Sequence, residues 1–187
     1  MSNPVFYPAD DSQKAFEWEG GCEDPRLIEA EDGTFFLTYS QWNRRTACLA
    51  IASSKDFIHW KKYGSIFEGT DNEWKNRWTK ARTILCELKE GRLRVTKING
   101  KYWIYFGELK IWVASSVDLI HWKPEKLVLE PPERNLDNDL VETGAPAVLT
   151  EKGIILLYNA KNKENRSYSS GQASFDKKIL HVSLLDL

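Results

Sequence analysis

Short runs of β-branched and aromatic residues alternate with polar segments along most of the chain. Each run is bounded by Gly, Asn, Asp, Ser or charged residues, as strands of an antiparallel sheet usually are. The six clearest runs span residues 34–40, 47–53, 92–98, 101–106, 110–115 and 154–159. Helical periodicity is rare, and the best candidate, residues 11–18, is stopped by Gly20 and Gly21. The pattern therefore predicts an all-β protein.

An internal repeat organises these predicted strands. Residues 53–60 read SSKDFIHW and residues 115–122 read SSVDLIHW, and a third strand opening begins at Gly153. We expect a repeated small antiparallel sheet whose last turn is tied by Ser and Asp hydrogen bonds and packed by Trp60 or Trp122. Small sheets repeated radially form a β-propeller. A β-sandwich with one duplicated hairpin is the alternative.

Composition narrows the class of protein. The 187 residues are 42% hydrophobic and 12% aromatic, which excludes intrinsic disorder and allows a buried core. The 26 basic and 27 acidic residues give a formal net charge of -1. This balance argues against a nucleic-acid or membrane partner, either of which would need a basic surface. Eight Trp, seven Tyr and eight Phe suit both strand packing and a sugar-binding cleft.

Targeting and cofactor signals are weak. The first residues lack a basic region followed by an apolar run, and no window approaches 18 apolar residues, so we expect neither a secretory signal nor a transmembrane helix. The cytoplasm is the default location, and the periplasm stays open. Three Cys without a CxxC pair and three scattered His predict no disulfide framework, no metal site and no cofactor.

Four motifs, in order along the chain, carry a resemblance to a known family. They are GGCEDPRL at residues 20–27, the two repeated turns, and LVETGAPAVLTEKGIILLYN at residues 140–159. Together they resemble glycoside hydrolase family 130, whose members are five-bladed β-propellers acting on β-mannosides. Residues 84–116 resemble more narrowly its β-1,2-mannosidase branch. The resemblance runs from about Pro4 to Asp176.

The length predicts an incomplete ring. Five blades need about twenty strands, and therefore at least roughly 200 residues. The matching region begins just before the EDPR sequence, and the tail after residues 171–176 departs from the family pattern. We therefore expect residues 1–187 to form a single partial propeller of about three blades, without the family's first blade and its C-terminal part. Its open edges would favour self-association.

The resemblance implies catalytic roles for three acids. Glycoside hydrolysis usually needs two carboxyl groups, an acid for the leaving oxygen and a base for water. Glu108 follows Gly107 after an aromatic strand, and Glu142 stands in LVETGAP; both match carboxylates of the mannosidase branch proposed to activate water. Asp24 in EDPR matches an aspartate thought to protonate the leaving oxygen through a sugar hydroxyl. The alternative is that these are ordinary surface or turn-stabilising acids.

Three cationic residues are candidates for holding the sugar. Arg26 can pair with Asp24 or Glu23 and would orient the acid or bind the sugar. Lys97 in TKINGKY matches a lysine that the family places at its sugar pocket, and Lys80 in WTKAR is a less certain neighbour. Either lysine could instead be a solvated surface charge, which is the commoner fate of lysine.

Uncharged candidates complete the predicted site. Asn159, at the end of an apolar strand, would bind a sugar hydroxyl or cap a turn. Trp42, Trp78 and Trp103 are possible stacking surfaces for a sugar. Trp103 fits a core position better, because it stands in the aromatic run KYWIYF.

The choice between water and phosphate decides the reaction class. Most of the family cleaves mannosides with phosphate, which requires cationic or polar donors. Its phosphorylases typically have a histidine in a YHG segment, where this chain has Tyr158, Asn159 and Ala160, and they lack acids matching Glu108 and Glu142. We therefore expect an inverting hydrolase of β-mannosides, in particular of β-1,2-linked manno-oligosaccharides. A β-mannoside phosphorylase and an inactive carbohydrate-binding remnant are the alternatives.

Overall fold

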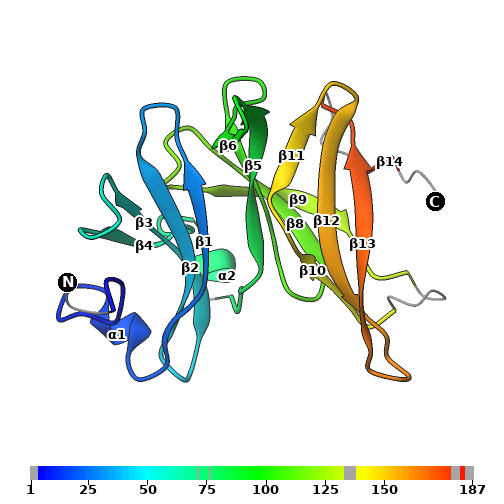
Figure 1. The fold of residues 1–187 in the computed structure, drawn as a ribbon. Helices are drawn as coiled ribbons and strands as arrows, with labels where there is room; N and C mark the ends of the chain where they lie inside the picture. The colour runs from blue at the N-terminus through cyan, green and yellow to red at the C-terminus, as the bar shows by residue number, and fades with distance from the viewer. Residues whose placement is uncertain (1–3, 71, 76, 133–137, 178–181, 184–187) are drawn as a thin grey trace.

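The computed structural model describes residues 4–70, 72–75, 77–132, 138–177 and 182–183. Its strands form three antiparallel groups, and two four-residue helices, α1 and α2, accompany them (Figure 1). The first group contains β1 (Gly21–Glu29), β2 (Phe35–Trp42), β3 (Ala47–Ser54) and β4 (Lys61–Ser65), with α1 (Lys14–Glu17) before it and α2 (Asn72–Lys75) after it. The second contains β5 (Arg82–Lys89), β6 (Arg92–Val95), β7 (Tyr102–Phe106), β8 (Ile111–Ser116) and β9 (Lys123–Leu129). The third contains β10 (Leu140–Thr143), β11 (Ala147–Thr150), β12 (Gly153–Lys161), β13 (Tyr168–Phe175) and β14 (Val182–Ser183).

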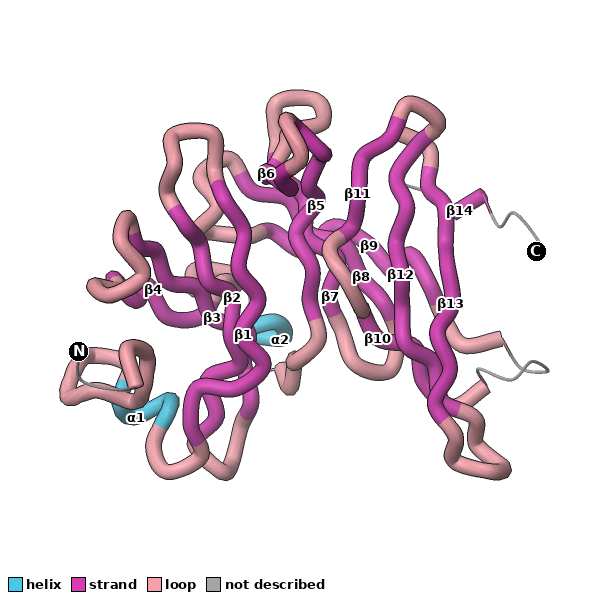
Figure 2. Tube along the Cα trace, viewed as in Figure 1, coloured by secondary structure: helices cyan, strands magenta, loops and turns pink. Residues whose placement is uncertain are grey.

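The three groups fan out from a centre where β1, β5 and β11 lie near one another (Figures 1 and 2). Within each group, most successive strands pair antiparallel, and β5 and β11 join the second and third groups through a parallel pairing of Leu85 with Ala147. The first group extends to the left of Figure 1 and the third to the right. This arrangement is a partial β-propeller of three blades, which confirms the predicted fold class. We call β1, β5, β10 and β11 the inner strands.

The hydrophobic core fills the two spaces between neighbouring blades. Ile51 of the first blade and Ile84 of the second belong to one buried cluster, whereas Leu85 of the second blade and Ile154 of the third belong to another. Successive side chains of a strand point to opposite faces, so adjacent residues of β5 contribute to both clusters. This double use of the middle blade explains the nearly continuous apolar run that follows Arg82.

The repeated SS-x-D-[FL]-I-H-W segment forms the same turn twice, between β3 and β4 and between β8 and β9. The amides of Phe57 and Leu119 each donate to a serine Oγ at 2.9 Å, that of Ser54 and that of Ser116. The following Asp carboxylate accepts two more amides in both copies. Trp122 is 2% exposed in the core. The prediction of a turn tied by Ser and Asp and packed by Trp is therefore confirmed.

The predicted helix at residues 11–18 is reduced to the four residues of α1. In this segment the chain packs against the first blade and forms no helix longer than α1. Glu17 is fully buried and accepts hydrogen bonds from Tyr39 Oη at 2.7 Å and Lys62 Nζ at 2.5 Å. Because two turns of regular helix would need an apolar stripe that this segment lacks, these polar contacts determine its course.

Membrane and metal features are absent from the described part of the chain. No helix in it is long and apolar enough to cross a membrane, and no group of three or more His, Cys, Asp or Glu side chains could hold a metal ion. Within these residues, Cys22, Cys48 and Cys86 form no disulfide.

Candidate active site

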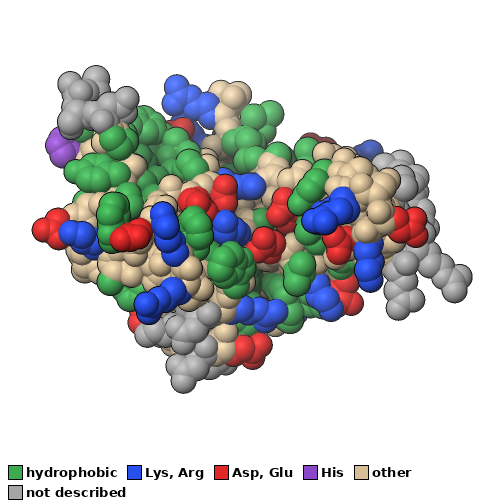
Figure 3. Space-filling model, turned by 90° about the horizontal axis from the view of Figure 1, so that it is seen from below, with side chains coloured by type: hydrophobic (Ala, Val, Ile, Leu, Met, Phe, Trp, Pro, Cys, Tyr) green, Lys and Arg blue, Asp and Glu red, His purple; other side chains and the backbone are tan. Residues whose placement is uncertain are grey.

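The three candidate acids lie at one end of the inner strands. Asp24 stands near the start of β1, and Glu142 lies on β10. Glu108 comes just after the end of β7, which runs antiparallel to β5 and so returns to the same end. Acidic and basic side chains intermingle across the centre of this face (Figure 3). The fold therefore brings together acids that are up to 118 residues apart in the sequence.

A bulge in β1 presents Asp24. The pairing of β1 with β2 shifts register between Glu23 and Arg26, and Asp24 has a φ of 50°. Pro25, which follows, cannot donate a ladder hydrogen bond. Bulges next to active sites commonly redirect a side chain, and here Asp24 is exposed at the face of the cluster.

Arg26 joins the first blade to the third. Its guanidinium donates to the backbone carbonyls of Thr143, at 3.1 Å, and of Gly144. Burial lowers the pKa of Arg26, whereas the nearby charges of Asp24 and Glu142 act against that shift. The predicted pairing with Asp24 or Glu23 thus takes the form of an electrostatic interaction with Asp24, while the hydrogen bonds go to the loop beside Glu142.

Arg82 lies beneath the acids, and sequence reasoning missed it. Its side chain is fully buried and donates to the carbonyls of Thr38, at 2.6 Å, Lys80, at 2.9 Å, and Asp24, and to the hydroxyl of Ser40 at 3.2 Å. Burial and then the charge of Arg26 lower the pKa of Arg82 to about 9. The available signal was an arginine placed directly before the apolar run TILC, because an arginine is rarely buried without dedicated acceptors.

Gly107 and Trp78 fix the position of Glu108. Gly107 has a φ of 124°, and a Cβ there would lie 2.1 Å from the carbonyl oxygen of Lys110, so only glycine fits this turn. Trp78 Nε1 donates to Glu108 Oε2 at 2.7 Å. The close backbone approach that the YFGE sequence indicated is thus present at Gly107. Trp78, which the sequence suggested as a stacking surface for a sugar, donates a hydrogen bond to the Glu108 carboxylate.

Glu142 pairs with Asn159 across the strands β10 and β12. Asn159 Nδ2 lies 3.5 Å from Glu142 Oε1. Desolvation raises the pKa of Glu142, the charges of Glu108 and Asp24 raise it further, and the Asn159 contact and the Arg26 charge oppose the change. These influences show that the three acids share one electrostatic environment.

Lys80 occupies the side of the cluster next to β1. Its ammonium lies 3.0 Å from Glu23 Oε2, 5.6 Å from the ring centre of Trp42 and 5.8 Å from that of Trp78. The two indoles and the ion pair form a partly exposed wall beside Asp24. Lys80 and Trp42, both predicted to contact substrate, therefore lie together beside the acid cluster.

The structure does not bring Lys97 to this cluster. The Lys97 side chain is exposed, and its ammonium lies 4.6 Å from the ring centre of Tyr102. Tyr102 begins β7, whereas Glu108 follows the other end of that strand, roughly 15–20 Å away at 3.3 Å per residue. A lysine in the connection before β7 is thus directed away from the acids. Trp103 packs against the second core cluster and donates to Ile98 O at 3.1 Å, as its core interpretation predicted.

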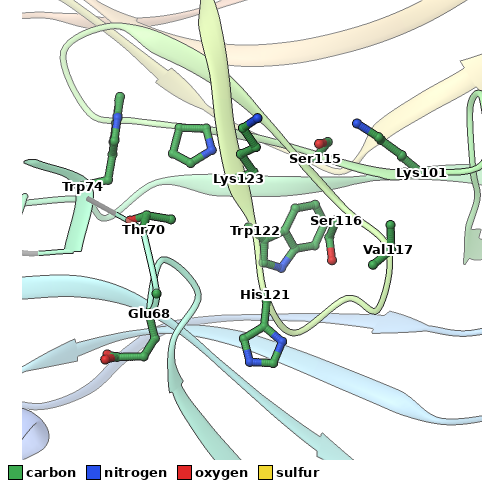
Figure 4. Close-up of a pocket in the computed structure, with 12 residues that line it drawn as sticks. Glu68, Thr70, Trp74, Lys101, Ser115, Ser116, Val117, His121, Trp122 and Lys123 are labelled. Carbon is green, nitrogen blue, oxygen red and sulfur yellow. The ribbon is translucent and has the colours of Figure 1, made fainter. Parts of the chain in front are cut away.

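A separate hollow of about 570 Å³ lies near the end of β8 at Ser116, which pairs with Tyr102 at the start of β7 (Figure 4). Ser116, His121, Trp122 and Lys101 line it, together with Trp74 from α2. None of the three candidate acids lines this hollow. It is therefore distinct from the acid cluster.

Radially arranged antiparallel sheets define a β-propeller, and a cluster of carboxyl groups is the usual equipment of a glycoside-cleaving enzyme. The chain matches the Glyco_hydro_130 family, described as beta-1,4-mannooligosaccharide phosphorylase, over residues 1–184. It belongs to this family, glycoside hydrolase family 130, whose enzymes act on mannosides. The resemblance inferred from the motifs is confirmed.

Solved structures with the same fold include hydrolases. A glycosyl hydrolase from Bacteroides ovatus is 41% identical, with a TM-score of 0.90, over 96% of this chain and 54% of that chain. A family 130 structure, described with glycoside hydrolases that target beta-1,2 mannosidic linkages in Candida mannan, is 40% identical, with a TM-score of 0.90, over 96% of this chain and 55% of the other.

Curated relatives are phosphorylases. Beta-1,2-mannobiose phosphorylase from Listeria innocua is 28% identical over 92% of this chain and 44% of its own length. The 1,2-beta-oligomannan phosphorylase from a Thermoanaerobacter species is 33% identical over 53% of this chain and 34% of its own. This chain thus spans less than half the length of these relatives and somewhat more than half of the solved structures.

Proposed function

We propose that this chain carries the catalytic groups of an inverting β-mannoside hydrolase acting on β-1,2-linked manno-oligosaccharides. The observation that carries the proposal is the half-buried Glu142 beside Glu108 and Asp24, with a pKa raised by desolvation and by those two charges. An inverting glycosidase needs a base on one side of the scissile bond and a proton donor on the other.

Glu142 acts as the general base in this proposal. A raised pKa makes its carboxylate a stronger proton acceptor than an ordinary glutamate, and catalytic bases work best with a pKa near the working pH. Asn159 holds one carboxylate oxygen at 3.5 Å, which leaves the other for water. Glu108, fixed by Trp78, orients that same water as the second member of the pair.

Asp24 supplies the proton for the leaving oxygen. The bulge in β1 leaves Asp24 exposed at the face of the cluster, and a sugar hydroxyl would relay the proton from Asp24 to the glycosidic oxygen. Water then adds to the anomeric carbon as the bond to the leaving oxygen breaks, and Glu142 takes the proton from water. Lys80 holds hydroxyl groups of the sugar, and Arg26, whose guanidinium is bound to the loop beside Glu142, orients Asp24 through its charge.

The hydrogen bonds that Arg26 and Arg82 already make support water over phosphate as the nucleophile. Arg82 directs its guanidinium to backbone carbonyls and hydroxyls, and Arg26 directs its own to the loop at Thr143 and Gly144. A phosphate dianion would need such donors. It would also meet repulsion from Glu108 and Glu142.

Phosphorolysis is the second candidate, because the curated relatives are phosphorylases. In that reaction phosphate would attack the anomeric carbon and mannose 1-phosphate would form. The acids of this chain would then have no proton to remove from the nucleophile. A binding remnant without turnover is the third candidate.

Turnover of β-1,2-mannobiose with and without phosphate tests the proposal. We expect mannose release that does not depend on phosphate, and loss of at least about 100-fold in kcat for Glu142→Gln with binding retained. Glu151→Gln is the matched control, because Glu151 is an exposed glutamate in the turn before β12. Phosphate-dependent mannose 1-phosphate formation would overturn hydrolysis, and binding without turnover in the parent chain would select the remnant.

A further inference from the structure

A hollow of about 360 Å³ adjoins the acid cluster on the side of α2 and β8. Residues from three segments line it: α2 and its following loop, the turn after β7, and the start of β8. Those that matter for the argument are Trp74, Arg77, Trp78, Glu108, Leu109 and Trp112. We call this hollow the α2 pocket.

The α2 pocket is continuous with the acid cluster through two shared residues. Trp78 and Glu108 line the pocket, and the hydrogen bond between them is part of the cluster. Trp78 is 47% exposed. Lys80 lies 5.8 Å from the centre of its ring. The Trp78 indole therefore belongs both to the wall beside Asp24 and to the lining of the α2 pocket, and a ligand bound at the acids can extend past it.

The lining of the α2 pocket has the chemistry that a sugar ring requires. The exposed Trp78 indole and the 64%-exposed side chain of Leu109 supply apolar surface for the C–H face of a hexose. The Arg77 guanidinium lies 4.6 Å from the ring centre of Trp74 and 5.3 Å from that of Trp112. An arginine carries five N–H donors, so it offers hydrogen bonds to hydroxyl groups at the edge of this apolar surface.

Two apolar side chains of the pocket, Trp78 and Leu109, do not belong to the hydrophobic core clusters. Trp74 and Trp112 already contact each other edge to face at 5.0 Å, and Trp74 packs on Phe106. Leu109 and Trp78 remain largely exposed beside them. Small apolar hollows with a few convergent polar groups are the usual form of ligand sites.

We infer that the α2 pocket binds a further mannosyl unit of an oligosaccharide whose scissile bond lies at Glu108 and Glu142. This inference rests on the proposed function and adds a preference for chains of at least three sugars. A disaccharide fills the positions at the acids, whereas a trisaccharide also reaches Trp78, Arg77 and Leu109.

Isothermal titration of β-1,2-mannobiose and β-1,2-mannotriose tests the inference without turnover, in the Glu142→Gln background. We expect the trisaccharide to bind about 5–10-fold more tightly, since one sugar contact of this kind contributes about as much as one hydrogen bond. Arg77→Ala should reduce the ratio of the two affinities to within about twofold and leave mannobiose binding unchanged.

Two further variants make the outcome specific. Leu109→Ala changes the pocket from another segment and should lower the same ratio. Arg92→Ala removes an exposed arginine of β6 outside the pocket and should leave the ratio unchanged. Equal affinities for the two sugars in the background protein, with mannobiose still bound, would overturn the α2 pocket and leave the hydrolase proposal intact. Loss of binding for both sugars would overturn both proposals.

Discussion

Replacing Trp78 by phenylalanine removes one hydrogen bond to a proposed catalytic carboxylate and keeps an aromatic ring. The bond that is lost joins Trp78 Nε1 to Glu108 Oε2 at 2.7 Å. Phenylalanine has no ring N–H, so Glu108 is free to leave the position that Gly107 and Trp78 give it. We therefore expect a change in catalysis rather than a change in fold.

The size of the effect follows from the exposure of the bond. A hydrogen bond to a charged group contributes about 1.5–3 kcal/mol when it is shielded from water. Trp78 is 47% exposed, so water competes for the carboxylate and about 1 kcal/mol is the better figure. A transition-state loss of that size lowers kcat/KM about fivefold.

The assay compares kcat/KM on β-1,2-mannobiose for Trp78→Phe and Trp103→Phe. Trp103 is the matched control, because its indole donates to Ile98 O at 3.1 Å on a different part of the second blade. We expect the Trp78 variant to lose about fivefold and the Trp103 variant to stay within twofold of the parent. Equal kcat/KM values for the two variants would refute a positioning role for Trp78.

Two further predictions concern Gly107 and Glu108. Gly107→Ala should lower the free energy of unfolding in urea by about 2–4 kcal/mol, because the new Cβ would meet Lys110 O and the residue has a φ of 124°. The control is Gly91→Ala, which has open space around it at a φ of 76° and should lower the same free energy by only about 1–2 kcal/mol. Equal losses for the two variants would contradict the clash at Gly107. Glu108→Gln removes a charge that, after desolvation, raises the pKa of Glu142. Since the base works when deprotonated, the acid limb of the residual pH–rate profile should move to lower pH; an unmoved limb would contradict the coupling.

The propeller itself was predictable, because its strands and its repeated turn depend on local sequence. The β-branched and aromatic runs that form β2, β7 and β12 are visible in single segments, and each copy of the turn carries its own Ser and Asp. By contrast, β1 contains Pro25 and several charges, so its sequence does not look like a strand. It is held by pairing with β2 on one side, which is tertiary information.

The candidate site was predictable in the clustering of its acids but not in its supporting contacts. Glu108 and Glu142 were found through motifs, and their shared location follows from strand direction. Arg82 depends on acceptors contributed by Thr38 and Ser40, more than forty positions earlier, and no local pattern records such contacts. Lys97 lies outside the acid cluster, beside Tyr102, for the related reason that a motif match fixes sequence position but not the end of the strand where a side chain lies.

A proton NMR time course of β-1,2-mannobiose cleavage in phosphate buffer tests the central claim most directly. Water and phosphate compete in one sample, and the first product identifies both the nucleophile and the stereochemistry. Hydrolysis with inversion predicts that α-mannose appears first, before mutarotation, and that mannose 1-phosphate stays absent. Mannose 1-phosphate as the main first product would contradict the assignment of Glu142 as the base that activates water.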